Sequence, residues 1–372
     1  MRIVLDYRPA LRQRSGVGEY VHELARHVAA KLDRESRLTL FSASWRDRLA
    51  PDVIPGCPIV DARVPVRVLN AAWHRLEWPS VERLSGATFD VAHSAHPLLM
   101  PARRAAQIVT IHDLDFLDHP EHTAREIRRD YPALAARHAR RASRVIVSSW
   151  QTAHEVETRL GVDASRIVLC PAGAPDWARD VGAATTRTPR HVLFLGTLEP
   201  RKNIAGLLDA WERVLAALPD APPLVLAGRA TPETERDRER LRREPLAGHV
   251  RAEGYVDDAG RQALYRDAAA LVVPSFHEGF GLTALEAMAC GVPVVASNRG
   301  SLPDVVGDAG LLVDPADAGA MAQALLAAIG DANVRARLIA AGHARAESFS
   351  WDASAATLID AYRAAAAEGP RR

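Results

Sequence analysis

The stretch from residue 270 to 297 reads ALVVPSFHEGFGLTALEAMACGVPVVAS and combines the signals of a strand, a loop, a helix and a second strand. ALVVPSF and PVVAS are short apolar runs rich in β-branched residues, as in buried strands. Between them, LTALEAMACG has the apolar spacing of a helix and ends at Gly291, a residue suited to a helix C-terminus. Such a unit indicates a parallel sheet covered by helices.

Similar units recur in two series along the 372 residues. The first contains RIVLDYR, RLTLFSA, QIVTIHD, RVIVSS and RIVLCPAG, with helical patterns such as EYVHELARHVAAKL among them. The second contains HVLFLGT, PLVLAG, RAEGYV, ALVVPS, PVVAS and AGLLVDP. Because the chain is longer than one core usually fills, this rhythm predicts an α/β protein of two doubly wound, Rossmann-like domains.

The segment PAGAPDWARDVGAATTRTPR lacks apolar periodicity and combines Pro, Gly and small polar residues, so it predicts a linker between about residues 174 and 190. We therefore expect domains over residues 1–175 and 176–350. Open parallel sheets bind ligands beyond the carboxyl ends of their strands. Two facing domains would place a ligand in the cleft between them.

Composition favours an ordinary globular protein, with 48% hydrophobic and 25% charged residues. Residues 1–175 carry 25 Lys and Arg against 20 Asp and Glu, and residues 176–372 carry 22 against 26, an asymmetry too small to indicate a nucleic-acid partner. The three cysteines are far apart and lack C-x-x-C spacing, which argues against a disulfide framework or a zinc knuckle. The chain begins directly with a strand pattern and has no apolar run of about 18 residues, so we expect a cytoplasmic protein.

Chemistry is predicted in EGFGLTALE, residues 278–286. Gly279 and Gly281 lie at or just before a helix N-terminus, where missing side chains expose backbone N–H groups to a phosphate. Glu286 can accept hydrogen bonds from a vicinal diol such as a ribose, and Glu278 can reach the hydroxyls of a sugar. The alternative is a capped helix with two solvated acids.

The stretch GTLEPRKN places Arg201 and Lys202 after a strand and before a helix. A guanidinium and an ammonium at that position can neutralise phosphate oxygens. A basic pair in a loop is also commonly solvated surface.

Two loops in the first half carry weaker signals. SGVG (15–18) supplies Gly16 and Gly18 before a helix, but Val21 occupies the third glycine position of a dinucleotide fingerprint. The loop is therefore either a flexible turn or a backbone loop that closes over a diphosphate, and a nicotinamide cofactor is disfavoured.

TIHDLDF (110–116) ends a strand with His112, which could bond a sugar hydroxyl or be a structural histidine. Asp113 and Asp115 suggest a metal-binding pair, but no second acid cluster accompanies them, so we expect no metal.

The segment RVPVRVLNAAWHRLEWP (63–79) mixes arginines and tryptophans with Val and Leu. Such a segment can lie on an anionic membrane surface. The helix is short and ends before Pro79, which favours packing beside the cleft instead.

Taken together, these motifs resemble glycosyltransferase family 4, the retaining enzymes with the two-domain GT-B fold. The motifs that carry the resemblance are PSFHEGFGLTALEAMACGVPVVAS with its E-x7-E, GTLEPRKN, TIHDLDF, SGVGEY and the ending SFSWDASAATLIDAYRAA. In this fold a last helix, here within residues 351–372, crosses back to the N-terminal, acceptor-binding domain.

The resemblance implies site roles. Arg201 and Lys202 match the pair that neutralises the donor diphosphate, and Glu286 matches the acid on the nucleotide ribose. The remaining matches are His112 beside the reacting sugar, Gly16 and Gly18 facing the diphosphate, and Glu278 with Gly279, Phe280, Gly281 and Leu282 around the donor sugar and its phosphates. Two departures are Thr197, where some relatives have an arginine, and Thr283 with Ala284, where many have prolines.

The resemblance implies retaining, metal-independent transfer of a hexose from a nucleoside-diphosphate sugar, without a cofactor. GTLEPRKN with VVGDAGLLVDP is similar to bacterial mannosyl- and rhamnosyltransferases of cell-surface polysaccharide assembly, which makes GDP-mannose the first candidate and a UDP- or dTDP-sugar the second. The acceptor would be a glycan or a lipid-linked glycan, and the latter would bring the protein to the inner membrane leaflet. A sugar-nucleotide epimerase and a non-catalytic nucleotide-sugar-binding subunit remain alternatives, whereas the two acids fit a glycosidase poorly.

Overall fold

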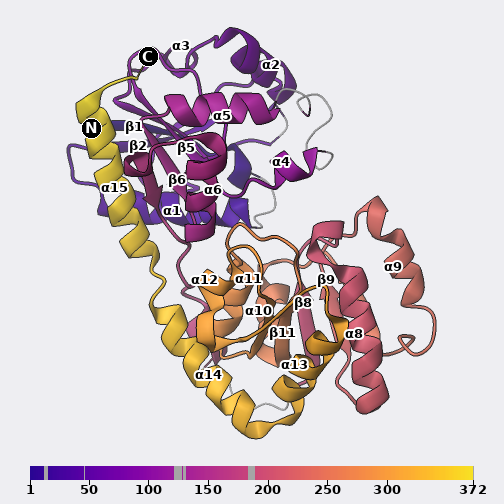
Figure 1. The fold of residues 1–372 in the computed structure, drawn as a ribbon. Helices are drawn as coiled ribbons and strands as arrows, with labels where there is room; N and C mark the ends of the chain where they lie inside the picture. The colour runs from indigo at the N-terminus through magenta and orange to yellow at the C-terminus, as the bar shows by residue number, and fades with distance from the viewer. Residues whose placement is uncertain (12–15, 46, 121–127, 129–130, 183–188, 372) are drawn as a thin grey trace. The chain divides into compact units, whose positions relative to one another are not determined.

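The computed structural model describes residues 1–11, 16–45, 47–120, 128, 131–182 and 189–371. The chain forms two compact units (Figure 1). Unit 1 comprises Met1–Ala172 and Ser350–Arg372, and unit 2 comprises Gly173–Phe349.

Unit 1 is built around a parallel sheet whose described strands have the order β3-β2-β1-β4-β5-β6-β7. The strands are β1 (Arg2–Asp6), β2 (Arg37–Ser42), β3 (Ile59–Asp61), β4 (Val91–Ser94), β5 (Ala106–Ile111), β6 (Arg144–Val147) and β7 (Ile167–Leu169). In the register, Leu5 of β1 lies between Leu40 and His93. Strand β1 is buried from Ile3 onward and lies inside the sheet, between β2 and β4.

Helices cover this sheet: α1 (Val17–Lys31), α2 (Val66–Leu76), α3 (Val81–Ser85), α4 (Asp115–Asp118), α5 (Tyr131–Arg141), α6 (Trp150–Leu160) and α15 (Trp351–Glu368), with short 3₁₀ turns η1 (Arg8–Ala10) and η3 (Ala164–Arg166). Helix α1 forms because apolar residues recur at helical spacing, and it buries Tyr20, Leu24 and Val28 on one side. Helix α6 begins at the Ser149 cap, whose side chain accepts from the Thr152 N–H.

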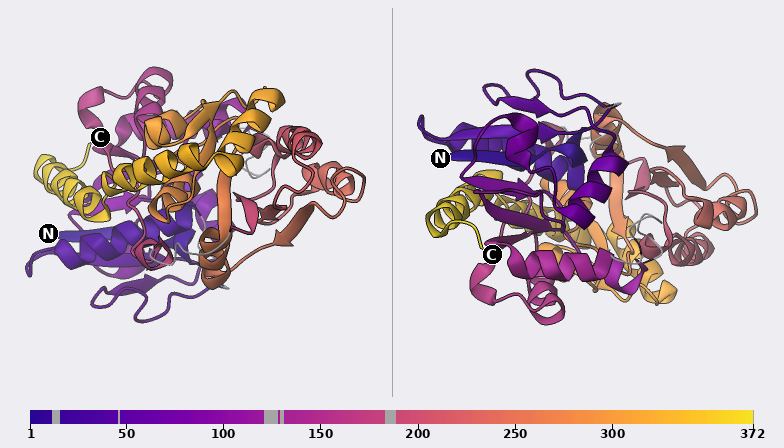
Figure 2. Two further views of the ribbon diagram at one scale, coloured as in Figure 1. Left: turned by 90° about the horizontal axis from the view of Figure 1, so that it is seen from below. Right: turned by 90° about the horizontal axis from the view of Figure 1, so that it is seen from above.

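Helix α15 is the C-terminal element and belongs to unit 1. It packs along α1, as the two further views in Figure 2 also show. The Tyr362 hydroxyl lies 2.7 Å from His93 Nδ1 on β4, and the Ser354 hydroxyl donates to the Pro171 carbonyl at 2.7 Å. The chain thus leaves unit 1 after Ala172 and returns to it at Ser350.

Unit 2 contains a second parallel sheet, with its described strands in the order β10-β9-β8-β11-β12-β13. The strands are β8 (His191–Leu195), β9 (Leu224–Ala227), β10 (Val250–Gly254), β11 (Ala268–Val273), β12 (Val294–Ser297) and β13 (Leu311–Val313). The first six strands of unit 1 and those of unit 2 follow the 3-2-1-4-5-6 order of doubly wound folds. The predicted α/β class with two such sheets is confirmed.

The helices of unit 2 are α7 (Ala178–Gly182), α8 (Ile204–Ala217), α9 (Glu235–Arg240), α10 (Asp258–Asp267), α11 (Leu282–Ala289), α12 (Leu302–Val306), α13 (Ala318–Gly330) and α14 (Ala332–Glu347), with turns η4 (Pro200–Lys202), η5 (Pro232–Thr234) and η6 (Gly307–Ala309). One core cluster contains Trp211 of α8 and Met321 of α13, and the other contains Leu285 and Met288 of α11. The sheet is therefore covered on both faces, and its polar chemistry is left to the loops at the strand ends.

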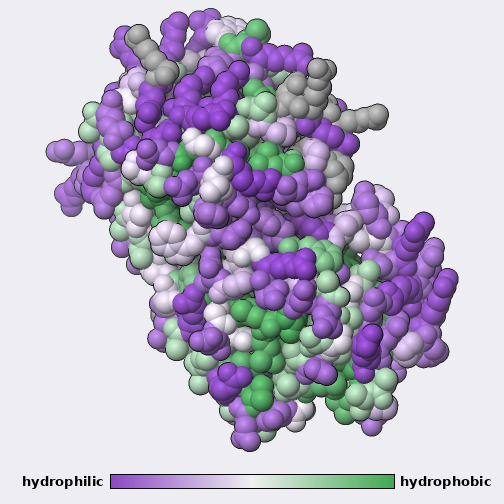
Figure 3. All heavy atoms as spheres, in the orientation of Figure 1, coloured by the Kyte–Doolittle hydropathy of each residue, from purple (hydrophilic) through white to green (hydrophobic). Residues whose placement is uncertain are grey.

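No helix within the described parts of the chain is both long enough and apolar enough to cross a bilayer. Hydrophilic residues cover most of the face seen in Figure 3.

Candidate functional site

Two loops at the carboxyl edge of the unit 2 sheet bring opposite charges together. Strands β8 and β11 are neighbours, and the loops that follow them carry Arg201 with Lys202 and Glu278, respectively. Lys202 Nζ forms an ion pair and a hydrogen bond with Glu278 Oε1, and Arg201 Nη1 lies 3.6 Å from Glu278 Oε2. The predicted basic pair and the first predicted acid therefore form one cluster.

Asn203 fixes the position of the basic pair. It adopts a left-handed conformation (φ 56°) at the N-cap of α8, and its side chain accepts from the Gly206 N–H at 3.2 Å. Its amide also donates to the carbonyls of Pro274 and Pro315, at 3.2 and 2.7 Å. One buried side chain thus joins the loops that follow β8, β11 and β13.

Glu278 is held by two buried serines. The Ser275 hydroxyl donates to Glu278 Oε1 at 2.7 Å, and the Ser301 hydroxyl donates to the Glu278 carbonyl at 2.8 Å. Burial alone would raise the pKa of Glu278, but the charges of Lys202 and Arg201 outweigh burial and hold the pKa below its usual value. Glu278 is therefore an ionised acceptor with a fixed orientation.

Arg201 has further contacts that orient its guanidinium. Its Nε lies 2.7 Å from Glu199 Oε1, and its Nη1 donates to the His277 carbonyl at 3.1 Å. The side chain of Arg201 is 24% exposed and that of Lys202 is 14% exposed. Both cations are thus reachable from solvent, and an incoming anion would compete with Glu199 and Glu278 for them.

Helix α11 starts next to this cluster, at Leu282 as the sequence predicts. Gly281 caps it with φ +100°, and a Cβ there would lie 2.7 Å from Leu302 Cδ2, so both backbone and packing require glycine. Phe280 packs edge-on against Phe349, with ring centroids 5.8 Å apart. Gly279, Phe280 and Gly281 form the turn before the helix, where its first N–H groups suit an anion.

Glu286 lies deeper in α11 and is only 2% exposed. Its Oε1 accepts from Arg261 Nη1 at 3.0 Å, and its Oε2 accepts from the Tyr265 hydroxyl at 2.8 Å. The Arg261 guanidinium in turn lies 5.3 Å from the Trp177 ring centroid. The second predicted acid is thus bonded to α10 and does not join the cluster around Glu278.

His112 follows β5 in unit 1, and its ring is in edge-to-face contact with Tyr20 at 5.1 Å. Burial lowers the pKa of His112 to about 4, although the charge of Asp113 and a hydrogen bond to the Ala95 carbonyl act in the opposite direction. Nε2 is buried and lacks a hydrogen-bond partner within the described residues. The ring is neutral, and because the other nitrogen serves Ala95, Nε2 is left as an acceptor.

Comparison with known proteins identifies the family. Residues 14–176 match the family described as Glycosyltransferase Family 4, and residues 189–331 match the one described as Glycosyl transferases group 1. The O-antigen chain mannosyltransferase B of Escherichia coli is 30% identical over 98% of this chain and 100% of the relative.

The chain belongs to glycosyltransferase family 4. A phosphatidyl-myo-inositol mannosyltransferase of Mycobacterium leprae is 36% identical to this chain, in an alignment that covers 51% of this chain and 50% of the relative. Among solved structures, the sucrose-phosphate synthase of Thermosynechococcus elongatus has a TM-score of 0.76 at 23% identity and covers 98% of both chains. Anabaena HepE in complex with UDP and glucose has a TM-score of 0.70 at 18% identity, covering 97% of this chain and 98% of that one. These structural likenesses establish the GT-B fold.

The glycine loop of the glycosyltransferase lies in unit 1. Gly16 caps α1 with φ +49°, and nothing lies within 4 Å of a Cβ built there. Gly18 is buried in the first turn, where a Cβ would lie 2.8 Å from the Pro9 carbonyl oxygen. Gly18 thus has a packing reason of its own, and the predicted Ser15 lies outside the described residues.

The sequence did not predict the residues that hold the two acids of the glycosyltransferase, Arg261, Tyr265, Ser275 and Ser301, or the partner of Arg201, Glu199. Each contacts its acid or cation through the fold, except Ser275 and Glu199, which are close in sequence but carry no distinctive signal alone. Asp113 accepts from the Asp115 N–H at 3.2 Å, a local turn contact. No group of three or more His, Cys, Asp or Glu residues that could hold a metal ion occurs within the described ranges.

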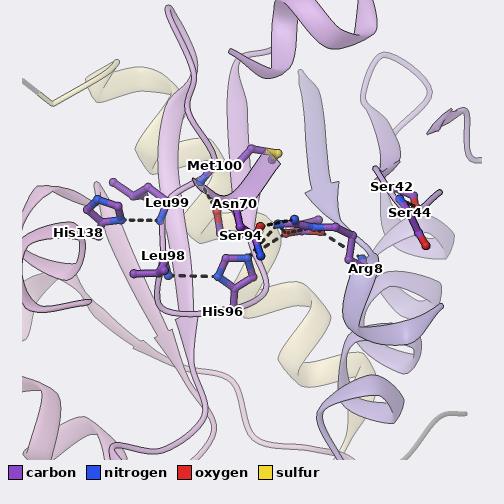
Figure 4. A network of polar contacts seen from close by, with 11 residues as sticks. Arg8, Ser42, Ser44, Asn70, Ser94, His96, Leu98, Leu99, Met100 and His138 are labelled. Carbon is purple, nitrogen blue, oxygen red and sulfur yellow. Dashed lines mark hydrogen bonds and ion pairs between the residues drawn. The ribbon is translucent and has the colours of Figure 1, made fainter. Parts of the chain in front are cut away.

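A second polar cluster, also missed, lies at the carboxyl edge of the unit 1 sheet. Arg8 Nε and Nη2 donate to the two oxygens of Asp6 at 2.8 and 2.6 Å, and Nη1 donates to Asn70 Oδ1 at 3.0 Å. His96 Nε2 lies 3.1 Å from Asp6 Oδ2, and Figure 4 shows Arg8, Asn70 and His96 together. Burial alone would raise the pKa of Asp6, but Arg8 and His96 hold it well below its usual value. This cluster is internally neutralised, with Asp6 fully buried.

Proposed function

We propose that the chain is a retaining glycosyltransferase that moves a hexose from a nucleoside-diphosphate sugar to a hydroxyl of a glycan or lipid-linked acceptor. The observation that carries this proposal is the meeting of Arg201 and Lys202 with Glu278 beyond the carboxyl ends of β8 and β11. Doubly wound sheets bind nucleotides at that edge.

The diphosphate would bind where the cations and the N-terminus of α11 lie together. Negative charge builds on its oxygens as the bond from phosphate oxygen to the anomeric carbon breaks. Arg201, Lys202 and the N–H groups after Gly281 are oriented before the reaction, so they stabilise this charge without rearrangement. We assign the neutralisation of the leaving group to these residues, without a metal.

Retention follows if the acceptor attacks from the face that the phosphate leaves. The acceptor oxygen then bonds to the anomeric carbon, and its proton passes to the departing phosphate oxygen, so atoms and charge balance. The ionised Glu278 would accept hydrogen bonds from the hydroxyls of the transferred sugar. His112 Nε2, a neutral acceptor, would bind another sugar hydroxyl.

Glu286 would bind the ribose diol in this scheme. Each carboxylate oxygen has two acceptor sites, so Glu286 can accept from a ribose while it keeps Arg261 and Tyr265. These two hydrogen bonds hold the Glu286 carboxylate in one orientation, so it is already positioned to accept from the ribose hydroxyls.

GDP-mannose is the first candidate donor because the O-antigen chain relative, which covers 98% of this chain, and the phosphatidyl-myo-inositol relative, which covers 51%, are named mannosyltransferases. A relative named for an O-antigen chain and another named for phosphatidyl-myo-inositol support a glycan or lipid-linked acceptor. Such an acceptor would place the enzyme at the cytoplasmic face of a membrane. The named relatives are transferases, which does not favour the epimerase alternative.

The proposal is tested with purified protein and a panel of GDP-, UDP- and dTDP-sugars. Nucleoside diphosphate release that requires an acceptor, with the α or β configuration of the donor kept in the product by NMR, is the expected result. Epimerised sugar nucleotide without acceptor would establish the isomerase instead. Calorimetric binding of a donor without transfer to any acceptor would establish a non-catalytic subunit.

A further inference from the structure

A pocket lies at the amino edge of the unit 1 sheet. Arg144 is the first residue of β6, and Arg166 directly precedes β7, the strand that pairs with β6. The end of α15 and the residues after it complete the lining. The lining residues are Arg144, Asp163, Ser165, Arg166, Glu368 and Arg371. Three separate segments of the chain thus bring three guanidinium groups to one pocket.

Arg144 is bonded to the acid of α15. Its Nη1 donates to Glu368 Oε2 at 2.8 Å, and its Nη2 pairs with Glu368 Oε1. The same Nη1 donates to the Ser143 carbonyl at 2.8 Å. The Arg144 side chain is only 13% exposed, so this two-point contact fixes the end of α15 to the start of β6. One of the three positive charges is thereby neutralised.

Arg166 is held by the backbone. Its Nη1 donates to the carbonyls of Arg140 and Ala142, at 2.8 and 3.0 Å. Both acceptors are neutral, so the guanidinium keeps its charge. Burial lowers the pKa of Arg166 below its usual value, and the charges of Arg371 and Arg144 act in the same direction. The arginines of the pocket therefore repel one another.

The acids of the pocket have other partners. Asp163 opposes the repulsion at Arg166, but its Oδ1 accepts from the Ser165 N–H at 2.9 Å and from the Ser165 hydroxyl at 2.6 Å. Glu368 is bonded to Arg144. The lining contains three cations and two anions, so the pocket has a net positive charge.

We infer that this pocket, called the amino-edge pocket, binds a phosphate group through the guanidinium groups of Arg166 and Arg371. The planar fork of an arginine matches two phosphate oxygens, and a doubly charged anion can neutralise two cations at once. The bound phosphate would replace repulsion by attraction and join the residues after α15 to the segment before β7.

The amino-edge pocket is independent of the proposed function. His112 follows β5 at the opposite, carboxyl edge of the same sheet, and the cations assigned to the donor lie in unit 2. Phosphate binding there would stabilise the docking of α15, which packs along α1 and completes unit 1. Binding needs neither donor nor acceptor, so its failure and the failure of sugar transfer are separate results.

Hydrogen exchange of the full-length protein with inorganic phosphate measures binding at this place. Ionic strength is held constant with chloride, and the Lys202→Ala variant serves as the background because phosphate can also bind at the donor cations. Protection of peptides from 161–169 and 360–371 should rise about tenfold when phosphate exceeds its Kd about tenfold. Glycerol 3-phosphate, tested in parallel, distinguishes a phosphomonoester from the free ion by which of the two binds more tightly.

Variants of the lining test the assignment. Arg371→Gln and Arg166→Gln should each raise the phosphate concentration for half-maximal protection about tenfold, because a charge-assisted contact is lost. Arg371 lies beyond the end of α15, so Arg371→Gln keeps the test valid if Arg166→Gln destabilises the fold. Glu368→Gln should lower that concentration about threefold, because it removes a negative charge and releases Arg144.

Arg363→Gln is the matched control. Arg363 is an arginine of the same helix, 55% exposed and paired with Asp33 and Asp360, and its loss should leave the phosphate response unchanged. Equal protection by chloride alone would overturn the inference and assign the effect to general screening. Equal phosphate responses of Arg371→Gln and the parent would also overturn it.

Discussion

The two units have the same order of strands around their first strand, but the loop after that strand carries different chemistry in each. After β1, Arg8 forms a two-point contact with Asp6, two residues away and fully buried. After β8, Arg201 and Lys202 meet Glu278, which comes from the neighbouring strand and leaves the cations partly exposed. In both units the sheet topology places charged residues at the carboxyl edge. The cation is partly exposed, and so available to a ligand, where its acid partner comes from a neighbouring loop.

The two units also differ in the pKa values of their buried histidines. Burial lowers the pKa of His93 to about 3 and that of His112 and His138 to about 4, all in unit 1. In the described part of unit 2, a lowered histidine pKa is resolved for His191. Unit 1 therefore holds several neutral imidazole rings in its interior, whereas His191 is the one with a resolved lowered pKa among the described residues of unit 2. Four changes test this contrast.

Arg8→Ala should have the largest effect on stability. It leaves Asp6 buried beside His96 without its main partner, which should cost about 3–5 kcal/mol of unfolding free energy. Chemical denaturation, monitored by hydrogen exchange of unit 1 peptides, measures this loss of unfolding free energy. The double variant with Asp6→Asn should recover part of it, and an unchanged unfolding free energy for Arg8→Ala would contradict the structural role assigned to the pair.

Lys202→Ala should act on turnover instead. In the proposed mechanism Lys202 neutralises the leaving diphosphate, so its removal should lower kcat about 10²–10³-fold. Steady-state kinetics with the donor identified in the panel measures the change. The chain has two lysines, and Lys31→Ala supplies the matched control, which should retain parental kcat. Equal kcat for both variants would remove Lys202 from the mechanism.

His93→Gln should reduce the acid sensitivity of unit 1. The pKa of His93 is about 3 in the folded chain, against an ordinary 6.5 when unfolded. The unfolded chain therefore binds the proton first, and stability falls as pH drops from about 6.5 towards 3. Between pH 7 and pH 5 the loss should be about 2 kcal/mol for this histidine.

Hydrogen exchange at both pH values resolves the two units separately. Unit 1 peptides should lose protection at pH 5 in the parent and lose less in His93→Gln, with unit 2 peptides as the internal reference. The same loss in parent and variant would show that His93 titrates normally in the folded chain.

Ser301→Ala should have the smallest effect. It removes a buried hydrogen bond to the Glu278 carbonyl, worth about 1 kcal/mol. Ser354→Ala removes a partly buried hydroxyl–carbonyl bond to Pro171 in unit 1 and should destabilise the chain similarly. We expect only Ser301→Ala to lower kcat/KM, because Ser301 orients Glu278. Parallel kinetic losses in both variants would mean that Ser301 acts through stability alone.

The sequence predicted the described strands apart from β3 and β4. Strand β3 has three residues, and two of the four residues of β4 are His93 and Ser94. A histidine in a central strand is tolerated here because Tyr362 and Thr110 bind its two nitrogens. Those contacts come from α15 and from β5, so no pattern in the sequence around His93 predicts them.

The same distinction applies to the candidate site. Arg201, Lys202 and Glu278 stand in recognisable loops after apolar strands, and their proximity follows from neighbouring strands. Ser301 and Tyr265 reach the acids through packing, and a serine or tyrosine in a helix or loop has many structural uses. Local chemistry was therefore predictable, and the side chains that orient it required the fold.

The position of helix α15 has a consequence for folding during synthesis. Residues 350–372 are synthesised after unit 2 and complete the unit that precedes it, since Tyr362 and Ser354 bind β4 and the end of the first stretch of unit 1. Unit 2 is encoded without interruption and can mature on the nascent chain before synthesis ends. Until α15 is synthesised, α1 lacks its packing partner on one side. A stop codon after Phe349 would therefore destabilise unit 1 and leave unit 2 intact.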